Sequence, residues 1–156
     1  MKRMKTACKL LCLALCVCLC LTGCAKDVLV ESYDNLLKAA GRLSLTPDLL
    51  LQGEREKSED GYSGAYRAEY RDFSGTETLL GGTTALDSHT VDVTCSITVE
   101  SGMLKLVLQR GSEEEVLLEG TGSYAGTLTL ESGSNFLCAV GESFRGTLQL
   151  ESTAAA

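Results

Sequence analysis

The chain has 156 residues, of which 44% are apolar, 22% charged and 5% aromatic, with one proline, one histidine and no tryptophan. This length suits a single domain. Sixteen glycines and five tyrosines exclude a coiled coil or a helical bundle, and the apolar fraction excludes a fully disordered chain.

The N-terminus has the pattern of an export signal. Four basic residues within positions 1–9 precede twelve uncharged apolar residues at 10–21. A membrane-spanning helix needs about 20 apolar residues, so this run is too short for a permanent span. We therefore predict that residues 1–23 form a signal peptide that is removed.

The signal ends in Leu21-Thr22-Gly23-Cys24, which resembles a bacterial lipobox. Cleavage between Gly23 and Cys24 would leave Cys24 as the first residue, with a diacylglyceryl group on its sulfur and further acylation, such as palmitate. Two acyl chains hold a protein stably on a membrane, whereas one holds weakly. The sequence thus predicts a lipoprotein on the extracytoplasmic face of the cell membrane, and ordinary secretion after general signal cleavage is the alternative.

Removal of the signal makes the chain more acidic. The full chain has a formal charge of −7, but four of its 14 basic residues and none of its 21 acidic ones lie in the signal. A surface this negative repels nucleic acid and anionic lipid heads. We therefore expect no nucleic-acid partner.

Residues 24–60 read as the lipid-anchored N-terminus followed by a helical and charged spacer. Apolar residues recur at helical spacing over residues 27–40. Thr46 is in position to cap a second helical turn that begins at Pro47. The polar run at 53–61 then reads as a linker.

From residue 61 the pattern changes to the alternation typical of strands with one buried face. In residues 89–100 the odd positions from Val91 onward are apolar and the even ones polar, and Ser101-Gly102 is typical of a hairpin turn. The pair Gly81-Gly82 is either a turn or a bulge. These segments predict an all-β fold, a small antiparallel β-sandwich of about seven to nine strands over residues 61–152, followed by a disordered tail at 153–156. A closed up-and-down arrangement also fits the short connections.

The cysteines divide by position. Five precede residue 24, Cys24 is the predicted anchor, and Cys95 and Cys138 remain. Their strand parity places both on inward faces, so they are either a candidate disulfide or two separate buried thiols. One histidine and two cysteines do not form a metal site at zinc-finger spacing.

The chain shows no catalytic motif. No base or orienting group can be assigned beside the single histidine, no carboxylate pair stands out, and no phosphate-binding loop is present. The sequence thus indicates a non-enzyme without cofactors. Its most suggestive binding feature is a stripe of alternating tyrosines that either stacks on sugar rings or forms a core layer: Tyr62, Tyr66 and Tyr70.

Five short motifs of turn and strand residues occur in the strand region: residues 62–66 (YSGAY), 73–83 (FSGTETLLGGT), 99–102 (VESG), 126–130 (GTLTL) and 141–148 (GESFRGTL). Their arrangement resembles small uncharacterised lipoproteins of clostridial-type Gram-positive gut bacteria. This resemblance implies a lipid-anchored, single-domain sandwich and no catalytic residues.

Three functions are therefore considered. The first is a membrane-anchored, non-catalytic interaction module with a protein or envelope partner. The second is a carbohydrate-binding module that uses the tyrosine stripe. The third is an extracytoplasmic hydrolase.

Overall fold

The computed structural model describes residues 45–84 and 88–155. These residues form a 3-10 helix, η1 (Asp48–Leu50), and six strands. The strands are β1 (Gly53–Lys57), β2 (Gly64–Thr84), β3 (His89–Arg110), β4 (Glu113–Glu119), β5 (Gly122–Leu130) and β6 (Gly133–Ala154). The predicted all-β, antiparallel fold is confirmed.

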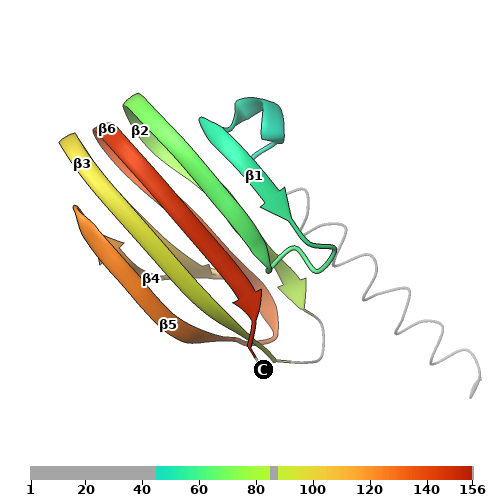
Figure 1. Cartoon of the computed structure of the whole chain (residues 1–156). Coiled ribbons are helices and arrows are strands. Elements are labelled where there is room, and N and C mark those ends of the chain that lie inside the picture. Colours follow the sequence, from blue (N-terminus) through green and yellow to red (C-terminus); the bar gives the residue numbers. More distant parts are fainter. Residues whose placement is uncertain (1–44, 85–87, 156) are drawn as a thin grey trace, which may run out of the picture. The chain divides into compact units, whose positions relative to one another are not determined.

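All strands belong to one antiparallel sheet with the order β1-β2-β6-β3-β4, and β5 pairs with β3 beside β4. The three central strands are 21 or 22 residues long and bend midway. Residues 89–97 of β3 pair with β5, whereas residues 105–110 pair with β4. The bend therefore folds the sheet into a near layer, β1-β2-β6-β3-β5, and a far layer, β2-β6-β3-β4 (Figure 1).

The bends are β-bulges that lie side by side. Register shifts occur in β2 at residues 70–75 and in β3 at residues 99–103, both opposite residues 141–146 of β6. Gly102 has φ 73°, and a Cβ there would lie 2.1 Å from the Ser143 carbonyl oxygen. Bulges increase local twist and bend a strand, so this row of irregularities closes the sheet over its core.

The expected hairpin at Ser101-Gly102 is wrong, because β3 continues through it. The bulge instead exchanges the two faces of the strand: the core residues of β3 are odd-numbered up to Ile97 and even-numbered from Leu104. The same exchange in β6 puts Leu137 and Ala139 in the core before the bend, and Phe144 and Leu148 after it. Three bent strands thus replace six shorter ones, which explains six strands instead of seven to nine.

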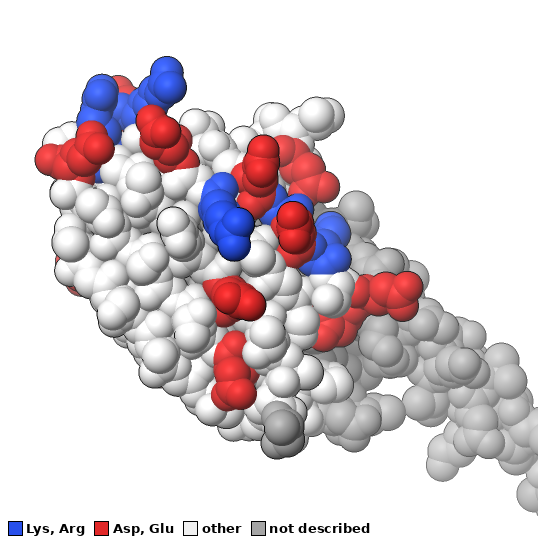
Figure 2. Space-filling view, in the orientation of Figure 1, with Lys and Arg blue, Asp and Glu red and all other residues white. Residues whose placement is uncertain are grey.

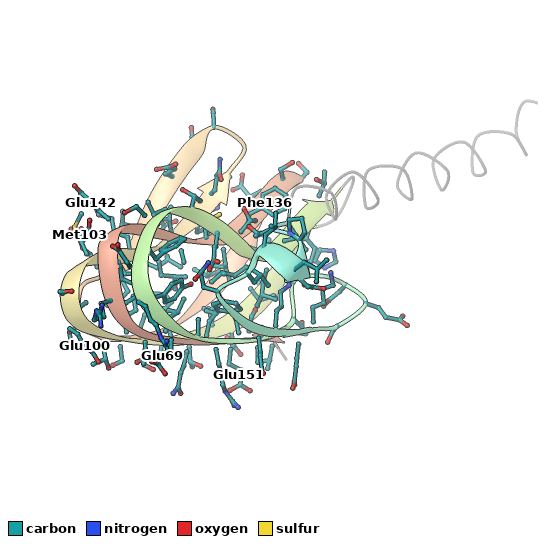
Figure 3. The ribbon with its side chains drawn as sticks, turned by 90° about the horizontal axis from the view of Figure 1, so that it is seen from above. Glu69, Glu100, Met103, Phe136, Glu142 and Glu151 are labelled. Carbon is teal, nitrogen blue, oxygen red and sulfur yellow. The ribbon has the colours of Figure 1, made fainter. Side chains whose placement is uncertain are left out.

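The main core lies between the two layers and takes side chains from both. Figure 3 shows the central ribbons curving around these side chains. The fully buried large residues are mostly aromatic or aliphatic, and include Tyr66, Tyr70, Phe144, Leu106 and Leu148. Burying such side chains contributes about 1.5–3 kcal/mol each.

Two boundary predictions change. The segment read as a charged linker contains β1, which pairs with residues 64–68 of β2, so the sheet begins before residue 61. Residues 153–155 of the predicted tail are not disordered: Ala154 pairs with Val91, and the Ala155 amide donates to the Thr90 carbonyl at 3.0 Å. The helix predicted over residues 27–40 lies outside the described residues.

The second predicted helical turn is a single 3-10 turn, and Thr46 does not cap it. Pro47 occupies the N-cap position without a side-chain cap bond. The Thr46 hydroxyl instead accepts a hydrogen bond from the Thr78 amide of β2 at 2.8 Å. The segment is thereby attached to the sheet edge.

Candidate binding surface

The predicted tyrosine stripe belongs to the core. Tyr62, Tyr66 and Tyr70 are 8%, 0% and 1% exposed, so none of them can stack on a sugar. The ring centroid of Tyr70 lies 4.9 Å from that of Phe73 and 5.2 Å from that of Phe144. The stacking role considered for these tyrosines is therefore wrong, and the alternative, an aromatic core layer, is confirmed.

A buried polar cluster joins two of these tyrosines to Glu77, which is 3% exposed. The Glu77 Oε2 atom accepts hydrogen bonds from the Tyr66 hydroxyl at 2.9 Å and from the Tyr70 hydroxyl at 2.6 Å. Its Oε1 atom accepts a bond from the Gln52 amide at 2.7 Å. Burial raises the pKa of both phenols, and the Glu77 carboxylate raises the pKa of Tyr70 further. The cluster is satisfied internally and stabilises the fold.

A buried guanidinium attaches the segment before β1 to the sheet. The Arg55 side chain is 2% exposed and forms an ion pair with Asp48. It also donates to the carbonyls of Thr46, Thr78 and Leu79 at 2.8, 3.2 and 3.0 Å. The Arg55 hydrogen bond and charge lower the pKa of the Asp48 carboxyl. Arg55 therefore occupies the edge of β2 beyond the end of β1.

The remaining cysteines are free, buried thiols. Cys95 lies in the main core, whereas Cys138 lies in a separate cluster with Leu45 and Phe136. The candidate disulfide is absent, because the face exchange in β6 turns Cys138 away from the main core. Burial raises the pKa of Cys95 to about 12 and that of Cys138 to about 11, which keeps both thiols protonated and unreactive.

A binding surface missed by the sequence reasoning lies on the outer face of the near layer. Register places two rows of outward residues across β2, β6, β3 and β5. One row runs Ala65, Glu151, Thr94, Ala125, and the next runs Arg67, Gln149, Ser96, Ser123. The short side chains among the longer ones leave a hollow of about 320 Å³. We call these eight residues the outer-face groove.

A second hollow, of about 370 Å³, continues this surface toward β1. It is lined by Glu56, Lys57 and the first residues of β2, and it shares Ala65 and Glu151 with the first. Figure 2 shows the acidic and basic side chains of this face interspersed. Glu151 points away from the enclosed core in Figure 3. The combined surface crosses from β1 to β5, perpendicular to the strands.

The long side chains of the groove are not held by other parts of the domain. Arg67, Gln149 and Glu151 are exposed, and among the described residues they take part in no side-chain hydrogen bond or ion pair. By contrast, the half-buried Arg110 pairs with Glu115 at 2.6 Å on the far layer. The groove thus presents a cation, an amide and a carboxylate that remain available to a ligand.

The predicted anchor, Gly23 and Cys24, lies outside the described residues. In residues 45–84 and 88–155 no helix is long and apolar enough to cross a membrane. The same ranges contain no group of three or more His, Cys, Asp or Glu side chains that could hold a metal ion. His89 is exposed, and its ring centroid lies 5.8 Å from that of Tyr62.

No protein-family model matches the chain, and no curated protein matches it. It is similar to the pre-peptidase C-terminal domain of a Bacillus anthracis collagenase, with 15% identity, a TM-score of 0.44 and coverage of 63% of this chain and 99% of that one. A second similar structure is the CBM35 from Paenibacillus barcinonensis, with 15% identity, a TM-score of 0.32 and coverage of 67% and 91%.

A third is an exo-β-1,3-galactanase from Phanerochaete chrysosporium, with 19% identity and a TM-score of 0.33. The match covers 65% of this chain and 27% of that enzyme, so the chain spans about a quarter of the enzyme's length. Similarities this distant do not bear on ligand or activity.

Proposed function

We propose that the chain is a lipid-anchored lipoprotein on the extracytoplasmic face of the cell membrane. We further propose that its β-domain is a non-catalytic module that binds an extended segment of a protein partner in the outer-face groove. The export pattern ending at Cys24 supports the anchor. The groove, with its three uncommitted polar side chains, is the observation that carries the binding role.

The dimensions of the groove fit an extended chain. Together with the second hollow it crosses five strands, and neighbouring strands lie about 4.8 Å apart, so the combined surface is about 19 Å long, or roughly six residues of extended polypeptide. Arg67 can donate to carbonyl or carboxylate oxygens, Glu151 can accept from amide or ammonium groups, and Gln149 can do both. This mixture of charges and hydrogen-bonding groups matches a polypeptide better than a uniformly charged polymer.

A glycan partner is less well supported, because the tyrosines that suggested sugar stacking are buried. The hydroxyl groups of Thr94, Ser96 and Ser123 could still bond to sugar hydroxyls. Binding of a glycan is therefore one of the results that the following experiment distinguishes.

A photo-crosslinking amino acid at Ser96, in the centre of the groove, tests the binding role in the full chain expressed in a Gram-positive host. The matched control carries the same amino acid at the exposed Glu114 of β4. We expect a crosslinked species from Ser96 alone that protease removes, and its loss in the R67A/Q149A/E151A variant. An adduct removed only by a cell-wall glycosidase would favour the glycan. Equal crosslinking from both positions, or none, would contradict binding in this groove.

A further inference from the structure

β5 is an edge strand whose outer side is open. It pairs with β3 alone, and no other described strand bonds to its second edge (Figure 1). Unpaired N–H and C=O groups on such an edge are a template for pairing with another strand. Natural sheets protect exposed edges with charged side chains, proline, bulges or a covering segment.

The other edges of the sheet are protected in these ways. β1 has the sequence GEREK, in which four of five residues are charged. β4 has the sequence EEEVLLE, in which four of seven residues are glutamates with no compensating base. The exposed edge of β2 beyond β1 is occupied by Thr46 and by the Arg55 guanidinium. β5, with the sequence GSYAGTLTL, has no charge, no proline and no register shift.

The alternation of hydrogen bonds shows which backbone groups are open. In β3, the Thr90 carbonyl points toward β6, where it accepts a hydrogen bond from the Ala155 amide. The Val99 amide points the other way and donates to the hydroxyl of Thr121, which directly precedes β5. Even residues of β3 therefore bond toward β6 and odd residues toward β5. The β5 partners of the odd residues are Gly122, Tyr124, Gly126 and Leu128. The residues between them direct their N–H and C=O groups to the open edge: Ser123, Ala125, Thr127 and Thr129.

We propose that β5 pairs antiparallel with β5 of a second copy of this chain, about a two-fold axis through Gly126. Such pairing sets Ser123 opposite Thr129 and Ala125 opposite Thr127 of the second copy, so that all four residues bond on their open side. It joins the two near layers into one sheet of ten strands. The pairing does not depend on the binding function proposed above.

The absence of charge on β5 lets a second copy occupy this edge. Two-fold pairing sets equivalent edges against one another, so like charges on an edge would repel those of the second copy. Pairing through β4 would place glutamates of one copy next to glutamates of the other, whereas pairing through β5 brings together only uncharged side chains. Figure 2 shows the margin where β5 runs as largely free of charged side chains.

The nearest charge on the neighbouring strand does not oppose the pairing. Asp92 of β3 accepts a hydrogen bond from the Thr127 hydroxyl at 2.5 Å. In the paired sheet the two copies of Asp92 would be three strand spacings apart, about 14 Å. That separation exceeds the screening length of about 8–10 Å at physiological salt.

Thr127→Pro in the full chain tests the pairing, because it removes an edge donor that makes no bond to β3. Thr127→Ala is the matched control, since it loses the same hydroxyl but keeps the amide. We expect light scattering in detergent to give a protein mass of two chains for wild type and T127A, and of one chain for T127P. The double variant A125K/T127K opposes lysines across the axis and should also give one chain.

A wild-type chain that stays monomeric as its concentration is raised would overturn the proposal. So would a dimer that persists in both T127P and A125K/T127K. Circular dichroism of each variant shows whether the sheet is intact. Should T127P prove unfolded, the lysine variant alone decides between pairing through β5 and pairing elsewhere.

Discussion

Tyr70→Phe is a sharp test of the buried polar cluster. The substitution keeps the ring, which packs against Phe73 and Phe144, and removes only the hydroxyl. That hydroxyl donates to the Glu77 carboxylate at 2.6 Å in a site where Tyr70 is 1% exposed. Since the site is closed, water cannot replace the lost donor.

The expected cost follows from the bonds that remain. Glu77 would keep its bonds from the Tyr66 hydroxyl and the Gln52 amide, and would lose one of three donors. A hydrogen bond to a charged group contributes about 1.5–3 kcal/mol. We therefore expect Tyr70→Phe to lower the free energy of unfolding by about 2 kcal/mol.

Urea denaturation followed by circular dichroism measures the change. With an m-value of about 2 kcal/mol/M, the midpoint should fall by about 1 M without a change in m. Tyr124→Phe is the matched control, because the Tyr124 hydroxyl has no hydrogen-bond partner among the described residues. Its cost should stay within about 0.5 kcal/mol. Equal midpoints for the two variants would refute the stabilising role of the cluster.

Three further substitutions or conditions test other parts of the fold. Arg55→Met should destabilise the domain by about 3 kcal/mol in the same urea assay, because three carbonyls lose a charged donor; an unchanged midpoint would contradict the attachment. Gly102→Ala should lower the free energy of unfolding by about 1–3 kcal/mol through its positive φ alone, and by more through the contact with the Ser143 carbonyl. An unchanged free energy of unfolding would contradict the role of Gly102 in the bend. The free energy of unfolding should fall as pH rises above 9, because Cys95 and Cys138 keep their protons when folded but ionise near 9 when unfolded; midpoints that do not change between pH values below and above 9 would contradict buried, protonated thiols.

The alternating pattern was sufficient to predict the fold class, because one residue in two along each strand is buried and the pattern shows it directly. The assignment of Val93 and Ile97 to the core was correct for this reason. The bends were not predictable, since Ser101-Gly102 has the composition of a hairpin turn whether the chain reverses there or continues through a bulge. For the same reason the side of the sheet on which Cys138 lies was not predictable, because one bulge inverts the parity of every residue beyond it.

The charged residues show a different limit. Arg55 stands in a polar run that has the composition of a linker, and only the position of β2 beside it supplies the carbonyls that bury its guanidinium. The outward rows of β3 and β2 were visible as the polar half of the alternation. Their assembly into one groove depends on the strand order β2-β6-β3-β5, which brings residues far apart in sequence into register.

The mass of the N-terminal peptide of the full chain, purified from the membranes of a Gram-positive host, tests the anchoring claim most directly. We predict a peptide that begins at Cys24 and carries a diacylglyceryl group, and a Cys24→Ala variant that is neither lipidated nor cleaved at that bond. A peptide from the wild-type chain that begins elsewhere, or that begins at Cys24 without lipid, would contradict the account.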